Sequence, residues 1–375
     1  MAATTTQTAS RVLNLAVVGV GLVGTELLHQ LSQPQLADKF RLVFVSNSKH
    51  SVSSLRPTHP KLDFTNWKQA LSESTAPPAL EDLPRILGEF VTPEKNSFVV
   101  VDNTSSEAVA LLYPKFLRAG VSVVTPNKKA FSSDLWLYDD IVASSTLTGA
   151  KFMNEATVGA GLPIISTLKD LVETGDKVKK IEGVFSGTLS YIFNEYSTPK
   201  GESESFSTVV RIAKEKGYTE PHPGDDLNGA DVARKLTILS RIIPSLCNSL
   251  HKGYESVSTT SLVPDVLASP EVTGTDFLQH LPDFDSHFAS MKDEALKEGK
   301  VLRYAGVVDV EKGEIRASLE KYPIDHPFAT SLGGSDNIIA FHTERYSPRP
   351  LIIQGAGAGA AVTAMGVLSD LLKLF

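Results

Sequence analysis

Short apolar runs alternate with amphipathic segments through roughly the first 155 residues of the chain. Residues 13–19 are almost wholly apolar and predict a buried strand, and residues 24–33, which follow a glycine-rich turn, predict a helix. Strands and helices at this spacing predict an α/β domain with a doubly wound parallel sheet. Further strands are expected at residues 41–46, 98–102, 121–125 and 151–154, and further helices at 67–72 and 107–118.

The pattern changes after Glu155, where glycine-rich and polar stretches separate longer helices. A long helix is expected at residues 228–243, and strands at 301–310 and 314–321 flank a short turn that predicts a hairpin. A strand is also expected at 179–184, helices at 189–196 and 207–216, and a last strand at 351–354 before a C-terminal helix. We therefore expect a first domain of residues 1–154, completed by the C-terminal strand and helix at 351–375, and a second, α+β domain of residues 155–350.

Three glycines lie between the first strand and the first helix in the pattern G-x-G-x-x-G. Gly19 permits a tight turn, Gly21 lets the backbone approach a pyrophosphate, and Gly24 allows the helix to pack closely on the strand. Glycines at such a turn also arise from packing alone, so the motif gains its value from its place between a strand and a helix. The pattern predicts a Rossmann-type dinucleotide site formed by Gly19, Val20, Gly21, Leu22, Val23 and Gly24.

The end of the second strand bears on the choice of cofactor. Enzymes that use NAD often place an acidic residue there for the ribose hydroxyl groups, about 20 residues beyond the glycines. Residues 46–50 read Ser-Asn-Ser-Lys-His and contain no carboxylate, and Lys49 could neutralise a 2′-phosphate. The sequence therefore favours NADP(H) and leaves NAD(H) open, because Lys49 is equally compatible with a solvated loop.

The densest group of charged residues lies between residues 217 and 235. Asp231 and Lys235 are four residues apart and share one face of the expected helix, and Asp226 lies just before it. Such a pair is often only a surface ion pair, and carboxylates before a helix are often only capping groups. Glu220 adds another acid near the same helix start. This convergence suits the binding of a zwitterion, with carboxylates for its ammonium group and a lysine for an oxygen.

Two more polar segments follow strands of the first domain. Residues 102–106 read Asp-Asn-Thr-Ser-Ser, and residues 125–129 read Thr-Pro-Asn-Lys-Lys. The carboxyl ends of strands in a doubly wound sheet face the ligand crevice, which predicts that both segments lie at that crevice. Without this topology, a charged loop that binds no ligand would be an equal alternative.

At these segments the chain resembles homoserine dehydrogenases, most closely the monofunctional fungal type, over residues 13–371. The most specific matches are residues 126–130, 154–161, 185–190 and 220–235. His222 departs from the family pattern, which usually has an acidic or small polar residue there; we expect a turn at this position and an enzyme that is still active. The resemblance implies a Rossmann-type domain beside an α+β domain for catalysis and dimerisation. It also implies NAD(P)-dependent interconversion of L-aspartate 4-semialdehyde and L-homoserine, a step toward threonine and methionine.

The resemblance also assigns roles around the substrate. Lys235 is implied as the proton donor to the carbonyl oxygen, and Asp231 as a residue that orients it or binds substrate. The other implied substrate residues are Glu220 and Asp226, for the amino group, and Gly187 and Thr188, for the carboxylate end.

On the cofactor side, the resemblance implies Lys129 as a catalytic residue between cofactor and substrate, either as a second proton donor or as an electrostatic stabiliser. It implies Thr104, Ser105, Ser106 and Gly359 as residues that line the cofactor. The family also binds a monovalent cation, usually sodium, near the domain junction, and the matching positions are Glu155, Val158, Ala160 and Leu162.

Charge and composition exclude several other classes of protein. The chain has 36 Lys plus Arg against 43 Asp plus Glu, a net charge of −7, which argues against a general nucleic-acid binder. Residues 351–368 are the longest stretch of low polarity, but they are mostly glycine and alanine and do not suit a membrane span. A single cysteine, Cys247, suits a reducing compartment. We therefore expect a cytoplasmic enzyme with a small-molecule substrate, no nucleic-acid or membrane partner and, from the resemblance, a homodimeric state.

Two rival interpretations use the same fold. A semialdehyde dehydrogenase needs a nucleophilic cysteine, and Cys247 stands in an apolar context with no signal of a partner histidine. An NADP(H)-binding redox sensor would need the nucleotide motif but not the acid–lysine block, so the presence of that block counts against it.

Overall fold

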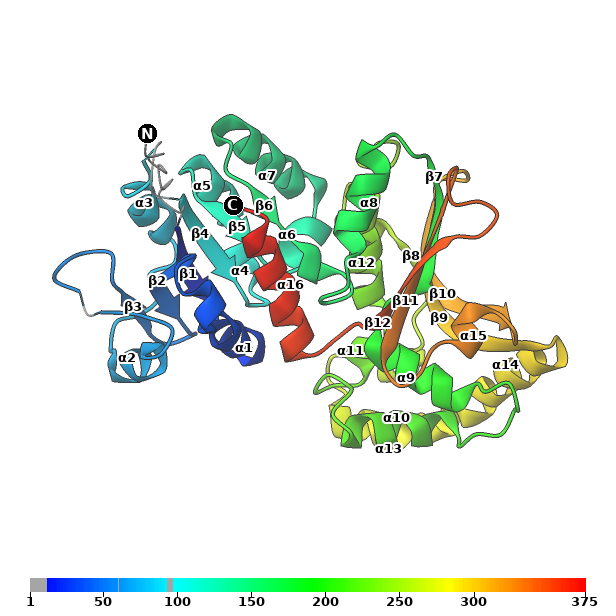
Figure 1. Ribbon diagram of the computed structural model, residues 1–375. Helices are drawn as coiled ribbons and strands as arrows, with labels where there is room; N and C mark the ends of the chain where they lie inside the picture. The colour runs from blue at the N-terminus through cyan, green and yellow to red at the C-terminus, as the bar shows by residue number, and fades with distance from the viewer. Residues whose placement is uncertain (1–11, 60, 93–96) are drawn as a thin grey trace. The chain divides into compact units, whose positions relative to one another are not determined.

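The computed structural model of the chain describes residues 12–59, 61–92 and 97–375. These residues fold into two compact units (Figure 1). The first unit takes its described residues from 1–130, 137–156 and 360–375, and the second unit comprises 131–136 and 157–359. The predicted boundary at residues 154/155 lies two residues from the division at 156/157.

The first unit contains a six-stranded sheet in the order β3-β2-β1-β4-β5-β6. All pairs run parallel except that of β2 with β3, which is antiparallel at one edge. Every residue of β1 is buried, as is usual for a strand inside a parallel sheet. The prediction of a doubly wound parallel sheet is thereby confirmed. The strands are β1 (Leu13–Val18), β2 (Phe40–Ser46), β3 (Ser51–Ser53), β4 (Ser97–Asp102), β5 (Ser122–Val124) and β6 (Phe152–Met153).

The helices of the first unit only partly follow the prediction. The single helix expected at residues 107–118 is two helices, because Pro114 occupies the first turn of the second, where proline can start a helix but not continue one. Two further helices, α3 and α7, were not predicted. The helices are α1 (Leu22–Leu31), α2 (Trp67–Glu73), α3 (Leu83–Gly88), α4 (Glu107–Ala110), α5 (Tyr113–Arg118), α7 (Leu135–Thr148) and α16 (Ala360–Leu372).

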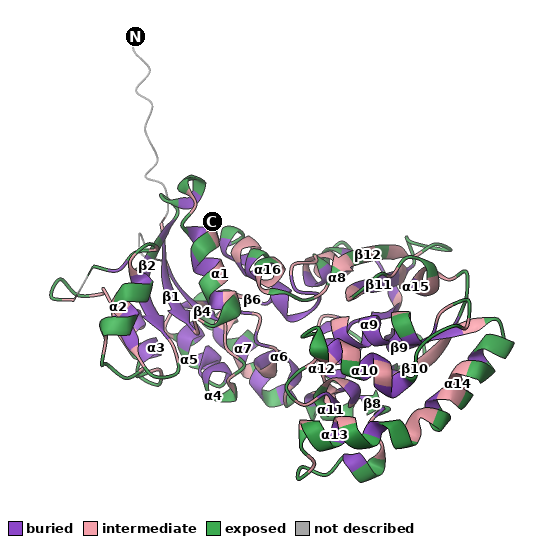
Figure 2. Ribbon diagram, turned by 90° about the horizontal axis from the view of Figure 1, so that it is seen from below, coloured by how far each residue is buried: buried purple, intermediate pink, exposed green. Residues whose placement is uncertain are grey.

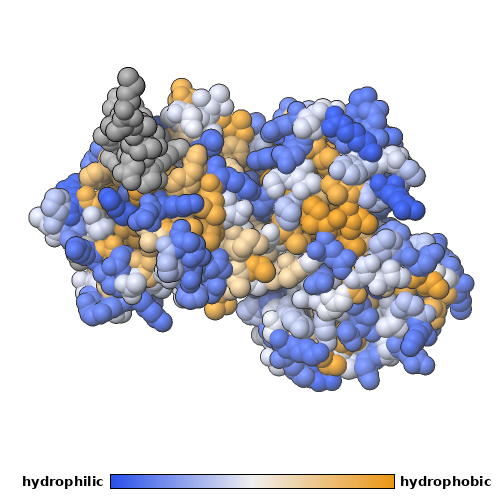
Figure 3. Space-filling view, viewed as in Figure 1, coloured by the Kyte–Doolittle hydropathy of each residue, from blue (hydrophilic) through white to orange (hydrophobic). Residues whose placement is uncertain are grey.

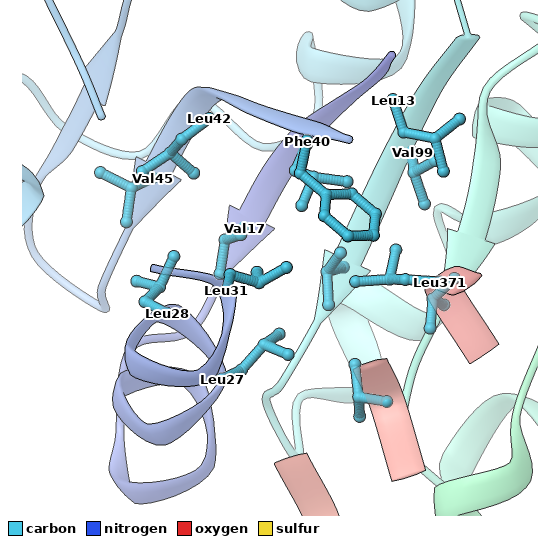
Figure 4. Packing of buried hydrophobic residues seen from close by; sticks show 14 of the residues in the cluster. Leu13, Val17, Leu27, Leu28, Leu31, Phe40, Leu42, Val45, Val99 and Leu371 are labelled. Carbon is cyan, nitrogen blue, oxygen red and sulfur yellow. The ribbon is translucent and has the colours of Figure 1, made fainter. Parts of the chain in front are cut away.

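The core of the first unit joins the two ends of the chain. Leu13 and Val17 of β1 pack with Leu27 of α1 and with Leu371 of α16 in one buried cluster (Figure 4). The side chain of Gln30 in α1 donates to the carbonyl oxygen of Ala361 at 3.0 Å. The C-terminal helix is therefore an integral part of the first unit, as predicted.

The second unit contains another six-stranded sheet, in the order β12-β11-β7-β9-β10-β8. β9 and β10 form the predicted antiparallel hairpin. The expectation that the C-terminal strand completes the first domain is wrong, since Leu351 pairs with Phe341 of β11 and the strand forms the edge of the second sheet. The strands are β7 (Val178–Val184), β8 (Ser258–Thr259), β9 (Lys300–Asp309), β10 (Glu314–Pro323), β11 (Asp336–Thr343) and β12 (Leu351–Ala356).

Helices α9 and α12 pack against the second sheet. A Cβ at Gly306 of β9 would lie 2.7 Å from the side chain of Leu236 in α12, so this close packing requires glycine. The amphipathic helix α14 keeps an exposed outer side (Figure 2). The helices are α8 (Ile164–Glu173), α9 (Gly187–Tyr196), α10 (Phe206–Glu215), α11 (Gly224–Leu227), α12 (Ala230–Ser240), α13 (Gly274–His280), α14 (Asp285–Lys297) and α15 (Pro327–Thr330).

Candidate active site

The glycine-rich turn between β1 and α1 has the geometry of a phosphate cradle. Gly19 has a φ of +86°, and a Cβ at Gly24 would lie 2.0 Å from the carbonyl oxygen of Gly19, so α1 can approach the turn only with glycine at position 24. A Cβ at Gly21 would meet nothing within 4 Å. Gly21 is the N-cap of α1 and provides no side-chain acceptor for the first N–H groups of the helix. This open helix start fits a pyrophosphate.

The other residues of the turn divide between core and surface. Val20 and Val23 pack against the core of the first unit, whereas Leu22 is 85% exposed. Only the backbone of Leu22 is therefore suited to a ligand at this turn.

The end of β2 carries polar groups and no carboxylate. The side-chain oxygen of Asn47 accepts hydrogen bonds from the backbone N–H groups of Lys49, at 2.8 Å, and His50, at 2.7 Å. These bonds hold a tight turn on which the Lys49 side chain is exposed. The hydroxyl of Ser46 is buried at the strand end and has no hydrogen-bond partner among the described residues.

A buried carboxylate joins the two polar segments that follow β4 and β5. Asp102 accepts hydrogen bonds from the backbone N–H of Thr104, at 2.8 Å, and from its hydroxyl, at 2.6 Å. Its second oxygen accepts from the hydroxyl of Tyr113, at 2.6 Å, and from the side-chain amide of Asn127, at 3.0 Å. Burial raises the pKa of Asp102. The predicted adjacency of the two segments is thus achieved through one side chain.

Asn127 extends this arrangement to both candidate cofactor segments. Its side-chain amide also donates to the carbonyl oxygen of Ser106 at 3.0 Å, and its side-chain oxygen accepts from the backbone N–H of Lys129 at 3.1 Å. Ser106 is the N-cap of α4, and its hydroxyl accepts from Val109 N–H at 3.4 Å. Ser105, between Thr104 and Ser106, is exposed. Sequence reasoning named the ends of this network but missed Asp102 and Asn127 as its centre.

In the second unit, the acid–lysine pair forms as the helical spacing predicted. Lys235 Nζ lies 2.7 Å from Asp231 Oδ2 and donates to the carbonyl oxygen of Phe185 at 2.7 Å. Lys235 is 7% exposed, whereas the Asp231 side chain is 41% exposed. The neighbouring residues Val232 and Leu236 are buried and fix α12 against the sheet. The pair is therefore not an ordinary surface ion pair, because its ammonium group is almost fully enclosed.

Thr188 and Asp226 meet at the start of α9. The hydroxyl of Thr188 donates to Asp226 Oδ1 at 2.9 Å and to the carbonyl oxygen of Tyr218 at 2.5 Å, and Asp226 Oδ2 accepts from the backbone N–H of Glu220 at 2.8 Å. Burial raises the pKa of Asp226 to about 6. Gly187 is the first residue of α9 and follows the N-cap Ser186. The predicted substrate residues Gly187, Thr188, Glu220 and Asp226 therefore lie close together.

Asp226 lies in the short helix α11, which precedes α12 as a separate element. His222 stands in the turn before α11, where its Nδ1 accepts from the backbone N–H of Gly224 at 3.0 Å and its Nε2 lies 3.1 Å from the carbonyl oxygen of Val272. The prediction of a turn at His222 is confirmed.

Sequence reasoning missed Asn337 of β11. This residue is fully buried, and its side-chain amide donates at 2.9 Å to the same Phe185 oxygen that Lys235 contacts. No motif marks it, because the partners are 152 positions apart in the chain.

The predicted cation positions are divided between the two units. Val158, Ala160 and Leu162 belong to a loop of the second unit, in which Ala160 has a φ of +54° and is the only non-glycine residue with positive φ in the described part of the chain. Glu155 belongs to the first unit, where its carboxylate lies 3.4 Å from Lys373 Nζ. Across residues 12–59, 61–92 and 97–375, no group of three or more His, Cys, Asp or Glu side chains could hold a metal ion. A cation in this loop would therefore depend on backbone carbonyl oxygens.

Three smaller observations complete the description of the chain. Gly359 has a φ of +119° immediately before α16, where the second unit ends in the chain. Cys247 Sγ is 3.2 Å from the carbonyl oxygen of Pro244, a local turn contact. No helix in the described ranges is both long enough and apolar enough to cross a membrane.

Comparison with known proteins places these features in one family. The family model for homoserine dehydrogenase matches residues 163–372, and the model for the homoserine dehydrogenase NAD-binding domain matches residues 19–155. A homoserine dehydrogenase from Schizosaccharomyces pombe is 48% identical over 372 residues, which covers 96% of this chain and 95% of that protein. The chain belongs to the homoserine dehydrogenase family.

Two further relatives agree with this assignment. A homoserine dehydrogenase from Saccharomyces cerevisiae is 46% identical over 373 residues, 97% of this chain and 98% of that protein. A crystal structure of a Candida auris protein of unknown function matches with a TM-score of 0.88 at 46% identity and covers 97% of this chain and 98% of that one. The resemblance to fungal homoserine dehydrogenases is confirmed. As a homoserine dehydrogenase, the chain is an oxidoreductase that interconverts L-aspartate 4-semialdehyde and L-homoserine.

Proposed function

We propose that Lys235 is the proton donor to the substrate carbonyl oxygen, and that Asp231 orients it. The supporting observation is the nearly buried ammonium group, held at 2.7 Å by both Asp231 and the Phe185 carbonyl oxygen. The nicotinamide cofactor supplies the hydride when it is bound. Negative charge then develops on the substrate oxygen, and an enclosed ammonium group both stabilises that charge and delivers the proton. In homoserine oxidation, neutral Lys235 takes the proton from the hydroxyl group.

Thr188, Asp226, Glu220 and Gly187 are proposed to hold the amino-acid end of the substrate. Asp226 is already ordered by Thr188 and the Glu220 backbone, so its carboxylate is preorganised for an ammonium group. Glu220 is exposed and adds a second negative charge beside it. The backbone at Gly187 opens α9 and is suited to the substrate carboxylate, since helix starts favour anions.

This assignment predicts a pH dependence in homoserine binding. Only ionised Asp226 attracts the substrate ammonium group, and its pKa is raised to about 6 in the free protein. We expect KM for homoserine to rise as the pH is lowered through about 6, because protonated Asp226 no longer attracts the ammonium group, whereas kcat follows the protonation of Lys235. Steady-state rates between pH 5 and 9 measure both.

Asp226→Asn and its neighbour Asp225→Asn form a matched pair for this test. Asp226→Asn is expected to lower kcat/KM at pH 8 by about 10–100-fold, as for loss of a charged hydrogen-bond partner, and to abolish the rise in KM near pH 6. Asp225 is exposed on the same short helix, so Asp225→Asn is expected to behave like the native enzyme. A rise in KM near pH 6 that persists in Asp226→Asn would contradict the role of Asp226.

We further propose NADP(H) as the preferred cofactor, with Gly19–Gly24, Thr104, Ser105, Ser106 and Gly359 around it. The open start of α1 supports pyrophosphate binding, and the Asp102–Asn127 network supports two fixed loops at the ends of β4 and β5. The backbone N–H of Lys129 donates to the side chain of Asn127 at the end of that network, and Lys129 is proposed as a cation beside cofactor and substrate. The turn after β2 has an exposed lysine and no carboxylate, as binding of a 2′-phosphate requires.

Cofactor preference is tested by initial rates of homoserine oxidation with NADP and with NAD. The native enzyme is expected to have the higher kcat/KM with NADP. Lys49→Ala is expected to lower that value several-fold while leaving the NAD value unchanged, because an exposed charge pair contributes about 1 kcal/mol or less. Lys61→Ala, an exposed lysine elsewhere in this unit, serves as the control. Equal effects of Lys49→Ala on both cofactors would exclude a 2′-phosphate contact.

We also propose sodium at the loop of Val158, Ala160 and Leu162, with Glu155 as the fourth position. The consecutive residues Gly159 and Ala160, which both have positive φ, support this proposal. A non-glycine residue is strained in this conformation, and such strain is concentrated at functional sites. Carbonyl oxygens are suitable ligands for a hard cation. Rates measured in sodium and in tetramethylammonium buffers of equal ionic strength should differ; equal rates and equal thermal stability would exclude the cation.

A cytoplasmic homodimer is proposed as the working form. Apolar side chains reach the surface of the second unit over β11 and β12 (Figure 3), where Ile352 is 38% exposed on the edge strand. An edge strand with exposed apolar residues is a natural pairing surface. Light scattering should give twice the mass of one chain, and a monomer at micromolar concentration would contradict the dimer. Fractionation of cells that express a tagged chain tests the compartment.

A further inference from the structure

A buried amide shares the carbonyl oxygen that holds Lys235. Asn337 Nδ2 donates to the Phe185 oxygen at 2.9 Å, and Lys235 Nζ donates to the same oxygen at 2.7 Å. We propose that Asn337 is a positioning residue for Lys235, which acts through the Phe185 carbonyl group to fix where the ammonium group lies. This inference rests on the proposed role of Lys235 as proton donor.

The Asn337 side chain is held in one place by the backbone beside it. A Cβ at Gly357 would lie 2.1–2.4 Å from the three outer atoms of the Asn337 side chain, so the amide packs directly on the main chain there. Asn337 also pairs with Gly355 in the β11–β12 ladder. Its orientation is chemically determined, because the reverse orientation would place two acceptor oxygens against each other. The amide is thus a rigid support for the Phe185 carbonyl group.

The oxygen of this amide is costly to bury. Asn337 Oδ1 is buried and has no hydrogen-bond partner among the described residues. An apolar side chain would avoid that cost, which is usually about 1–3 kcal/mol for a buried unsatisfied polar atom. Packing alone therefore does not account for asparagine here. The hydrogen bond from Asn337 to the Phe185 oxygen does account for asparagine, since the same oxygen accepts a hydrogen bond from the proposed proton donor.

Shared donation also affects the proton affinity of Lys235. The Phe185 oxygen stabilises the ammonium group of Lys235. The Asn337 N–H carries a partial positive charge and contacts the same oxygen, so it weakens the attraction between that oxygen and the ammonium group. Lys235 is paired with Asp231 on its own helix, and the Phe185 carbonyl, just after β7, and the Asn337 amide of β11 contribute neutral groups. Loss of the Asn337 donor is therefore expected to strengthen the hold of the Phe185 oxygen on the ammonium group.

The test compares Asn337→Leu and Asn337→Asp with the native enzyme in homoserine oxidation over pH 6–10. We expect kcat at pH 8 to fall about tenfold in Asn337→Leu, as for the loss of one hydrogen bond. KM for homoserine should stay within about twofold, since Thr188 and Asp226 are untouched. The acidic limb of kcat, on which Lys235 becomes the neutral base, should move to higher pH in both variants. The larger shift is expected in Asn337→Asp, which places a carboxyl group beside the Phe185 oxygen that holds the ammonium group.

Asn194→Leu is the matched control. Its amide donates to the carbonyl oxygen of Gly334 at 3.2 Å in the same unit, and its side-chain oxygen is likewise buried without a partner in the described chain. Thermal unfolding and NADPH binding identify the folded variants, and Asn337→Ser replaces any variant that does not fold. A native kcat–pH profile in a folded Asn337 variant, or a change that Asn194→Leu reproduces, would overturn the inference.

Lys235→Met separates this inference from the function on which it rests. If Lys235→Met keeps native turnover, the proposed proton donor is wrong, and the positioning role fails with it. If Lys235→Met is inactive while folded Asn337 variants keep the native profile, the proton donor stands and only the role of Asn337 is wrong.

Discussion

Replacement of Lys235 by methionine is expected to lower kcat for homoserine oxidation by about 10²–10⁴-fold, the usual contribution of a positioned proton-transfer group. Methionine has similar length and suits a site that is 7% exposed. Asp231 is partly solvated and tolerates loss of its partner, and the Phe185 oxygen keeps the Asn337 donor. The fold and NADPH binding are therefore expected to survive. Stopped-flow or steady-state rates, together with NADPH fluorescence titration, measure the two effects separately.

Lys297→Met provides the control for this substitution. Lys297 is exposed at the end of α14, and its replacement is expected to leave kcat unchanged. Native turnover in Lys235→Met would exclude the proposed proton donor. Loss of NADPH binding together with turnover would instead show that the substitution disturbs more than proton transfer.

Gly24→Ala is expected to damage both the first unit and its cofactor binding. The new Cβ would lie 2.0 Å from the backbone oxygen of Gly19, an atom that cannot move independently, so α1 must shift away from β1. Overpacking of this kind costs about 1–3 kcal/mol. We expect a fall in Tm and at least a tenfold rise in the Kd for NADPH, measured by thermal unfolding and fluorescence titration.

Gly21→Ala is the matched comparison, because the same methyl group at Gly21 meets no protein atom within 4 Å. Its Tm is expected to stay native while NADPH binding weakens, since the methyl group enters the space that the pyrophosphate would occupy. If Gly21→Ala binds NADPH as tightly as the native chain, the cofactor phosphates do not lie at this turn. If Gly24→Ala keeps the native Tm, the close packing of α1 on the turn is not needed.

The parts of this protein that sequence could predict are those encoded locally. An apolar run and three glycines are enough to indicate β1, its turn and α1, because each feature depends on neighbours within a few positions. Asp231 and Lys235 meet because four residues span one helical turn. Sequence also indicated the hairpin of β9 and β10, since its turn residues lie between two alternating strands.

Features that depend on partners far apart in the sequence could not be predicted from local patterns. Asp102 contacts Asn127 across 25 positions, and Asn337 contacts Phe185 across 152. A single buried Asp or Asn has no periodic pattern, so only the fold shows which groups it joins. The edge strand β12 was assigned to the wrong sheet for a related reason: its apolar residues suit either sheet, and its ladder with β11 is decided by long-range packing.

Because α16 is part of the core of the first unit, that core can be completed only after α16 has been synthesised. Gln30 of α1 and Ala361 at the start of α16 are 331 positions apart, which is on the order of 20–60 s of translation. Throughout that interval, the leucines of β1 and α1 lack the C-terminal side chains that cover them in the finished core. The strand and helix that carry the glycine-rich turn are therefore synthesised long before the helix that completes their core.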